Sequence, residues 1–115
     1  MRVIDLQGAK EFSPTHHIYK FLAESDRCSI GIACWEPRQT SPIHSHPHAD
    51  EIYHVLEGEG LFRDGQTERR LGPGATVHFP AGEVHQVHSL TRMVLYRVQA
   101  GADRHPEFME AWPQP

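Results

Sequence analysis

Short apolar runs separated by turn residues follow one another along the whole chain. Nine glycines and nine prolines are spread between these runs. No helical stripe of any length precedes residue 103, so the pattern predicts a series of about ten short strands. The expected strands are Arg2–Leu6, His17–Leu22, Cys28–Glu36, Ile43–His46, Glu51–Glu57, Gly60–Arg63, Thr67–Leu71, Ala75–Phe79, Val84–Ser89 and Arg92–Gln99.

Turn residues divide the second half of the chain. Asp64-Gly65 lies between two apolar runs and predicts a hairpin with a type I′ turn, which needs positive φ at both central positions. Gly72-Pro73-Gly74 predicts a second tight turn, and the tail from Asp103 to Trp112 is expected to form a helical turn. Strands this short and numerous favour a β-sandwich or barrel.

Length and charge limit the function. A chain of 115 residues is expected to form one domain, residues 1–115, with one core. The net charge of −4 and the lack of a Lys/Arg cluster argue against nucleic acid and anionic lipid as partners. No apolar run is long enough for a membrane span, and the start of the chain is too polar for a signal peptide, which predicts a cytoplasmic protein. Cys28 and Cys34 lie too far apart in one strand to bridge, which predicts free thiols.

Ten histidines are the unusual feature of the composition. His44 and His46 are two residues apart in an expected strand, so both side chains project from one face and can bind a single ion. Pro47 interrupts the strand, and Glu51 begins the next one. His85 follows a strand and a tight turn. Three imidazoles and one carboxylate would form a mixed nitrogen and oxygen site.

Two spaced motifs carry a family resemblance. The run His44-x-His46-x4-Glu51-x6-Gly58 resembles the first motif of the cupin superfamily, and Gly74-x5-Pro80-x-Gly82-x2-His85 resembles the second. The resemblance implies a small single-domain cupin, an all-β double-stranded β-helix or jelly-roll barrel. Two positions depart from the family pattern: Arg38 replaces a glycine before the first motif, and Ser89 replaces an asparagine that ends the second.

The resemblance also implies a metal site and its ligands. These are His44, His46, Glu51 and His85, with one divalent transition metal per chain. Iron, manganese or nickel is favoured by the donor set, and zinc also fits. Four ligands leave two positions open on an octahedral ion, as a catalyst requires. His48 is too close to Glu51 for the family spacing and is expected at the pocket rim or surface.

Side chains facing the metal are expected to be mostly apolar, which suits a small organic ligand. Tyr53 lies two residues after Glu51 on the same face and is the expected proton-transfer residue, and Glu51 itself is a second candidate for that role. Tyr96 is a further polar candidate for the wall. The expected apolar wall consists of Ile30, Ile32, Val55, Val77, Phe79 and Val87.

Three classes of function remain open. The first is a dioxygenase whose substrate chelates the metal beside O2, and this oxidoreductase is the preferred hypothesis. The second is a redox-neutral isomerase, lyase or decarboxylase in which the metal acts as a Lewis acid. The third is a non-catalytic module that binds a small molecule on the same barrel.

Alternation along the strands predicts which side chains face outward. Trp35 is expected on the outer face, out of phase with Ile30 and Ile32, and a large exposed apolar residue favours a homodimer that covers it. His54 and His78 are also expected on the outer face.

Overall fold

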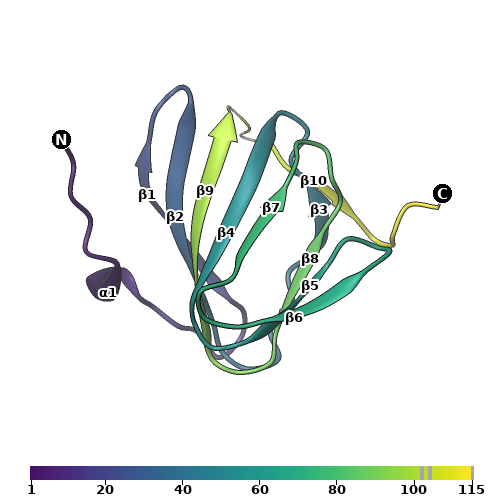
Figure 1. Ribbon diagram of the computed structural model, residues 1–115, viewed down its shortest axis with the longest axis horizontal. Helices are drawn as coiled ribbons and strands as arrows, with labels where there is room; N and C mark the ends of the chain where they lie inside the picture. The colour runs from purple at the N-terminus through teal and green to yellow at the C-terminus, as the bar shows by residue number, and fades with distance from the viewer. Residues whose placement is uncertain (102, 104, 115) are drawn as a thin grey trace.

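Two antiparallel sheets face one another in this chain (Figure 1). The structure is a computed structural model that describes residues 1–101, 103 and 105–114. One sheet has the order β1 (Ile18–Glu24), β2 (Cys28–Trp35), β9 (Met93–Gly101), β4 (Ala49–Glu57) and β7 (Thr76–Phe79). The other side consists of β6 (Glu68–Leu71), β5 (Gly60–Arg63) and β8 (Gln86–Ser89), together with the pair β10 (Glu107–Met109) and β3 (Ile43–Ser45).

Isolated bridges join the two parts of the second side. His44 pairs with His85 and Thr40 pairs with His88, so β3 lies beside the segment that leads into β8. The backbone N–H groups of His44 and His85 each donate to the other's carbonyl, at 3.0 and 2.8 Å. The predicted all-β jelly-roll barrel is therefore confirmed.

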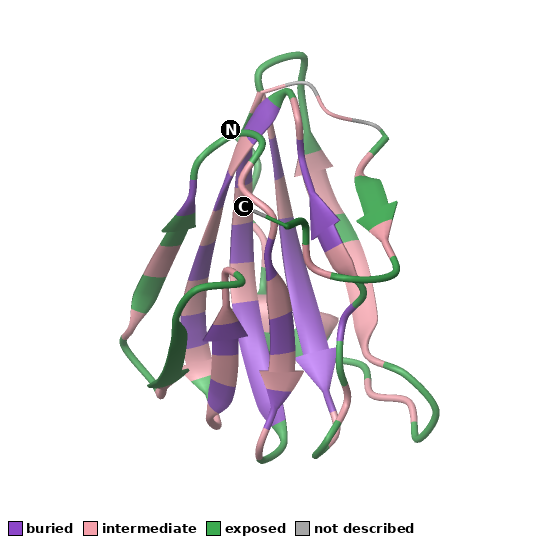
Figure 2. Cartoon of the chain, turned by 90° about the vertical axis from the view of Figure 1, so that its right-hand side faces the viewer, coloured by how far each residue is buried: buried purple, intermediate pink, exposed green. Residues whose placement is uncertain are grey.

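The interior between the sheets is apolar at one end and polar at the other. Cross-strand neighbours Ala33, Leu95 and Val55 form an apolar row, whereas the row through Gln99 and Glu51 is polar. Buried positions gather along the central strands, and the edge strand β6 is mostly exposed (Figure 2). The buried apolar cluster consists of Ala33, Trp35, Tyr53, Val55, Phe62, Phe79, Val87, Met93 and Leu95.

The prediction for the faces of β2 is wrong. Ile32 and Cys34 face away from the barrel interior and pack against the N-terminal segment, while Trp35 is 1% exposed and belongs to the interior cluster. Both faces of β2 are buried, so its sequence carries no clear alternation. Because Trp35 is buried inside the barrel, it gives no support for a homodimer. The homodimer stays a prediction.

Tyr96 is also assigned to the wrong face. On β9, the residues in phase with Leu95 of the interior cluster are Arg97 and Gln99, both buried. Tyr96 is half-buried on the other face of the strand. The expectation that apolar side chains face the interior fails here, because the interior at this end of the barrel is polar.

Both ends of the chain differ from the prediction. The expected strand at Arg2–Leu6 is replaced by a single helical turn, α1 (Leu6–Ala9), whose N-cap Asp5 accepts a hydrogen bond from the N–H of Gln7. In the tail, the expected helical turn is replaced at Glu107–Met109 by β10, which pairs with β3. Burial of Leu6 and Ala9 against the outer side of the large sheet holds the first segment in place.

The two predicted turns are present, with one correction. The β5–β6 hairpin is confirmed, but only Gly65 has a positive φ, at 91°, so the turn is not type I′. The Asp64 carboxylate instead accepts from the N–H groups of Gln66 and Thr67, at 2.9 and 2.7 Å. Gly74 has a φ of 93° in the second turn.

The cysteines and the helices can be compared with the predictions from the sequence. Cys28 and Cys34 are free thiols, as predicted. Within the described part of the chain, no helix has the length and apolar character needed to cross a membrane.

The two departures from the family motifs meet in one turn. Arg38 has a φ of 66°, a left-handed conformation that favours the glycine the family has at this position. The Ser89 hydroxyl donates to the Glu36 carbonyl at 2.6 Å and accepts from the Gln39 N–H at 2.9 Å. Ser89 therefore holds the turn that Arg38 strains.

Replacing Arg38 by glycine should stabilise the protein. Relief of the left-handed strain outweighs the entropy that glycine adds to the unfolded chain, with a net gain of roughly 0.5 to 1 kcal/mol. Urea unfolding of the purified variants measures this gain. Arg38→Ala keeps a Cβ and is the control, so an equal gain in both variants would contradict the explanation.

Candidate metal centre

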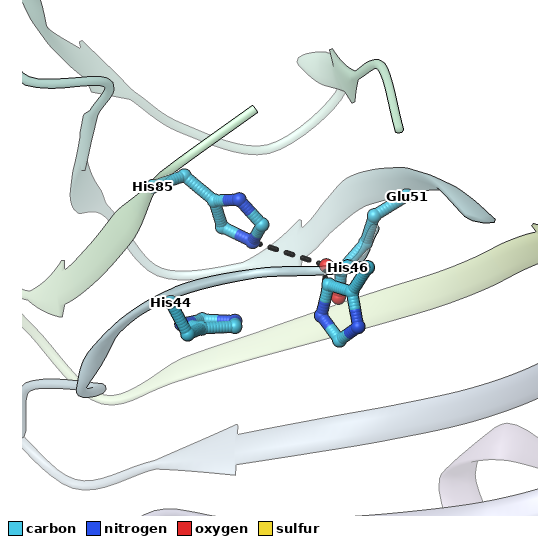
Figure 3. A group of neighbouring side chains, drawn as sticks. All are labelled: His44, His46, Glu51 and His85. Atoms are coloured by element: carbon cyan, nitrogen blue, oxygen red, sulfur yellow. Dashed lines mark ion pairs between the residues drawn. The ribbon is translucent and has the colours of Figure 1, made fainter. Parts of the chain in front are cut away.

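Four side chains meet between the two sheets at the polar end of the barrel. His44 lies on β3 and His85 is its backbone partner, so these two imidazoles are cross-strand neighbours with ring centroids 4.3 Å apart. His46 follows β3, and Glu51 reaches the same point from β4 of the facing sheet. One ligand atom from each residue lies within 4.8 Å of the others, and all four residues are buried (Figure 3).

Backbone carbonyls fix the tautomers of two of these histidines. His44 Nδ1 lies 2.7 Å from the Pro42 carbonyl oxygen, and His85 Nδ1 lies 3.0 Å from that of Glu83. Because a carbonyl only accepts, each Nδ1 carries the hydrogen. The neutral rings then present the lone pair of Nε2, the form in which histidine binds a metal.

Three buried atoms of the cluster meet one another without a hydrogen bond of acceptable geometry among the described residues. His46 Nε2 and His85 Nε2 lie 2.7 and 3.0 Å from Glu51 Oε2, yet none of the three atoms makes a hydrogen bond of acceptable geometry. Buried polar atoms without partners are rare. Three imidazole nitrogens and one carboxylate oxygen converging in this way fit one divalent transition metal.

Arg97 and Gln99, which the sequence analysis missed, surround this cluster. Arg97 Nε lies 2.7 Å from Glu51 Oε1, and its Nη2 donates to Gln99 Oε1 at 2.6 Å. Gln99 Nε2 lies 3.3 Å from His46 Nδ1. Burial favours the neutral form of Glu51, but its close polar contacts with His46 and His85 and the charge of Arg97 outweigh burial and hold the pKa of its carboxyl well below the usual value. Glu51 is therefore ionised.

Burial and, to a lesser extent, the nearby His85 lower the pKa of His44 from 6.5 to about 4. The ring stays neutral and ready to bind a metal in mildly acidic solution. Loss of metal near pH 6.5, the value expected for an ordinary histidine, is therefore not expected from protonation of this ligand.

A cavity of ≈ 290 Å³ opens over the cluster. Tyr53 lies on the wall of this cavity and is 7% exposed. The prediction that its side chain points into the barrel is confirmed. Burial and the charge of Glu51 raise the pKa of the Tyr53 hydroxyl well above the usual value. Other wall residues that the sequence did not identify include His17, Tyr19, Trp35, Arg97 and Phe108.

Three histidines outside the cluster lie where the sequence analysis expects them. His48 is exposed, and His54 and His78 form hydrogen bonds with outer-face partners, Thr76 Oγ1 and Asp50 Oδ2. His17 stacks on Trp35 with ring centroids 3.9 Å apart, a contact that the sequence did not predict. The inverted face of β2 hid this contact, because it placed Trp35 outside the barrel.

Comparison with known families agrees with the geometry. The family model for the cupin domain matches residues 31–106, which include all four candidate ligands. The chain belongs to the cupin family. The protein TT1209 from Thermus thermophilus is 30% identical with a TM-score of 0.81 over 88% of this chain and 98% of that chain. A Klebsiella pneumoniae protein with a double-stranded β-helix domain has a TM-score of 0.87 at 18% identity, over 96% and 99% of the two chains, which shows the shared fold.

One curated relative is an enzyme. Dimethylsulfoniopropionate lyase DddQ of Ruegeria pomeroyi is 44% identical to this cupin over 61 residues, which is 49% of this chain and 30% of the lyase. The crystal structure of DddQ aligns with a TM-score of 0.74 at 27% identity, over 93% of this chain and 59% of that chain. This cupin thus spans less than two thirds of the length of DddQ.

Removing one ligand should abolish stoichiometric metal binding. In His85→Ala, we expect metal affinity to fall by more than about 100-fold, because loss of a ligand exceeds the cost of losing an outer hydrogen bond. Elemental analysis of the purified protein measures the metal content. His88→Ala, three residues along and bonded to Thr40 on the outside, is the control that should keep the metal. Retained stoichiometric metal in His85→Ala would refute the site.

The stability of the metal-free protein should fall in acid. Between pH 6.5 and 4 the unfolded chain binds a proton on His44 that the folded chain does not. Stability therefore drops between about pH 7 and 5, by about 1 to 2 kcal/mol from this group. Urea unfolding at both pH values checks the drop, which should be smaller in His44→Gln and unchanged in His54→Gln. An equal drop in both variants would contradict this assignment.

Proposed function

We propose that this cupin is a metal-dependent lyase that breaks a carbon–heteroatom bond of a small organic substrate without O2. The observation that carries the proposal is a buried tyrosine, Tyr53, on the wall of the cavity above His44, His46 and Glu51. A proton-transfer group beside a Lewis-acid site is the combination that elimination from an acidic C–H requires.

The relatives support a redox-neutral reaction over the dioxygenase hypothesis. DddQ, with 44% identity over 61 residues, is a lyase by name, and elimination consumes neither oxidant nor reductant. The segment shared with DddQ is 30% of that protein. We therefore propose only the same reaction class, and the substrate in the name of DddQ is the first compound to test.

The four candidate ligands are assigned to the metal. His44 and His85 present Nε2 because their Nδ1 groups donate to backbone carbonyls. Glu51 presents Oε2, while Oε1 is held by Arg97. When bound, a divalent ion polarises a substrate oxygen and, through its charge, favours the ionised form of a neighbouring acid.

Tyr53 is assigned to proton transfer. Burial and the charge of Glu51 raise its pKa and keep the hydroxyl protonated in the metal-free protein. Glu51 does not take this role, because its lowered pKa and its contact with Arg97 make it a weak base. In the elimination, Tyr53 as the phenolate would take the proton from the carbon next to the one that bears the heteroatom. The C–H electron pair becomes the second bond of the carbon–carbon double bond, and the heteroatom group leaves with the electrons of its own bond to carbon.

Assays under argon test the reaction class. We expect the zinc- or manganese-loaded protein to turn over dimethylsulfoniopropionate, or another acid with a leaving group on its β-carbon, equally fast with and without O2. Gas chromatography detects dimethyl sulfide, the other product being acrylate. Turnover that requires O2 would support the dioxygenase hypothesis, and ligand binding without turnover of any such compound would support the non-catalytic one.

Replacement of one hydroxyl tests the role of Tyr53. In Tyr53→Phe, kcat should fall by about 100-fold or more while the metal content stays unchanged. The control is Tyr96→Phe, which also removes a tyrosine hydroxyl but on the face of β9 that points away from the barrel interior. This variant should keep full activity. Normal activity in Tyr53→Phe would exclude this residue from the reaction.

A further inference from the structure

A second cavity of ≈ 330 Å³ adjoins the one above the candidate metal site. Its wall is formed by β1, β2 and the end of β9, with Phe21, Ser29 and Gln99 among the lining residues. His46, Arg97 and Pro106 line both cavities, so they mark the junction between them. A ligand at this junction can reach the metal site from one cavity and extend into the other.

Arg97 is the charged group at this junction. Its side chain is 8% exposed, and two strong contacts hold it: Nε faces Glu51 Oε1 at 2.7 Å and Nη2 donates to Gln99 Oε1 at 2.6 Å. The Tyr19 ring lies below the guanidinium, with its centroid 4.6 Å from Cζ. Neither of the two polar contacts uses Nη1. A guanidinium has five N–H donors in a planar fork, so donors remain after these two contacts and the neighbouring Tyr19 hydroxyl are served.

Two other donors of the cavity wall lack an acceptor: the Trp35 indole N–H has no hydrogen-bond partner among the described residues, and the Tyr19 hydroxyl has the Arg97 guanidinium beside it, which only donates. The Tyr19 hydroxyl and the Trp35 indole N–H both belong to residues that line the cavity over the metal site. The Tyr19 hydroxyl lies over Gly31, where a Cβ would be 1.9 Å from it, so the absence of a side chain at Gly31 makes room for it. Buried donors without acceptors are costly, and a ligand oxygen would satisfy them.

The balance of buried charge indicates the sign of the ligand. Among the described residues at the site, Glu51 and the Asp103 carboxylate, 3.5 Å from His46 Nδ1, are the buried negative groups, and Arg97 is the buried positive one. With a divalent ion added, the positive charges exceed the negative ones by a single unit. Glu24 also lines the second cavity, but it is exposed and its charge is screened by solvent. A ligand with one negative charge therefore neutralises the interior.

We propose that Arg97 binds the carboxylate of a small organic acid at the junction of the two cavities. A planar carboxylate matches the guanidinium fork, and its single charge matches the excess. A phosphate monoester carries nearly two negative charges at pH 7 and would exceed it. This inference names the substrate class for the proposed lyase and so rests on that proposed function, with Arg97 as the specificity-determining residue.

Binding of two isosteres tests the proposal. Isothermal titration calorimetry at constant ionic strength compares propionate with its neutral analogue propionamide on cobalt-loaded protein. We expect propionate to bind about tenfold or more tightly than propionamide, and Arg97→Met to lose this preference. Arg69→Met removes the same charge from exposed strand β6 and should leave the preference intact.

The visible spectrum of the bound cobalt separates Arg97 from the metal as the carboxylate site. A preference that persists in Arg97→Met, together with a change of the spectrum on adding propionate, would overturn the proposal and place the carboxylate on the ion. If Arg97→Met does not fold, Arg97→Lys keeps a charge opposite Glu51 but not the fork. It should lose most of the preference, and an unchanged preference would also overturn the proposal.

The binding assay is independent of turnover, so the two proposals can fail separately. Arg97-dependent binding of propionate without elimination from any β-substituted acid would refute the lyase but keep the carboxylate site. Elimination with equal binding of propionate and propionamide would keep the lyase and refute the carboxylate site.

Discussion

A buried carboxylate, that of Glu51, is the group around which the polar interior of this cupin is arranged. It is 1% exposed and ionised, and a buried charge is tolerated only where other groups compensate it. Its two oxygens face different partners: Oε1 faces Arg97, and Oε2 faces His46 and His85. The carboxylate thereby connects the candidate metal site to the cationic side chain at the junction of the cavities.

This connection couples the chemistry of the site to its electrostatics. Arg97 faces one oxygen of Glu51, and the other oxygen faces the candidate metal site. The guanidinium withdraws negative charge from the carboxylate, which would make Glu51 a weaker base and a weaker metal ligand. A less strongly donating ligand would leave a bound ion a better Lewis acid, which suits the proposed redox-neutral reaction. The same guanidinium lies beyond the four candidate ligands, so the proposed carboxylate site and the candidate metal site share one salt bridge.

The four candidate ligands could be predicted from the sequence, whereas most of the residues that surround them could not. His44 and His46 could be found because alternation along a strand places residues two apart on one face, and the motif spacing added Glu51 and His85. Arg97 and Gln99 were missed because the rule that apolar residues face the interior assigned Tyr96 to that side. Trp35 was misplaced because the N-terminal segment covers the outer face of β2, so apolar residues occupy both faces.

The amino-acid sequence by itself determined the strand succession between residues 17 and 99, the positions of the two turns and the four residues of the candidate metal site, since these follow from local periodicity and fixed spacing. Only the tertiary structure decided which faces of β2 and β9 point inward, and which groups surround the four residues. Ser29, Arg97 and Asp103 are far from the motifs along the chain, and sheet register and the return of the tail bring them to the site. Pairing between distant segments is a property of the folded chain, so no local pattern records it.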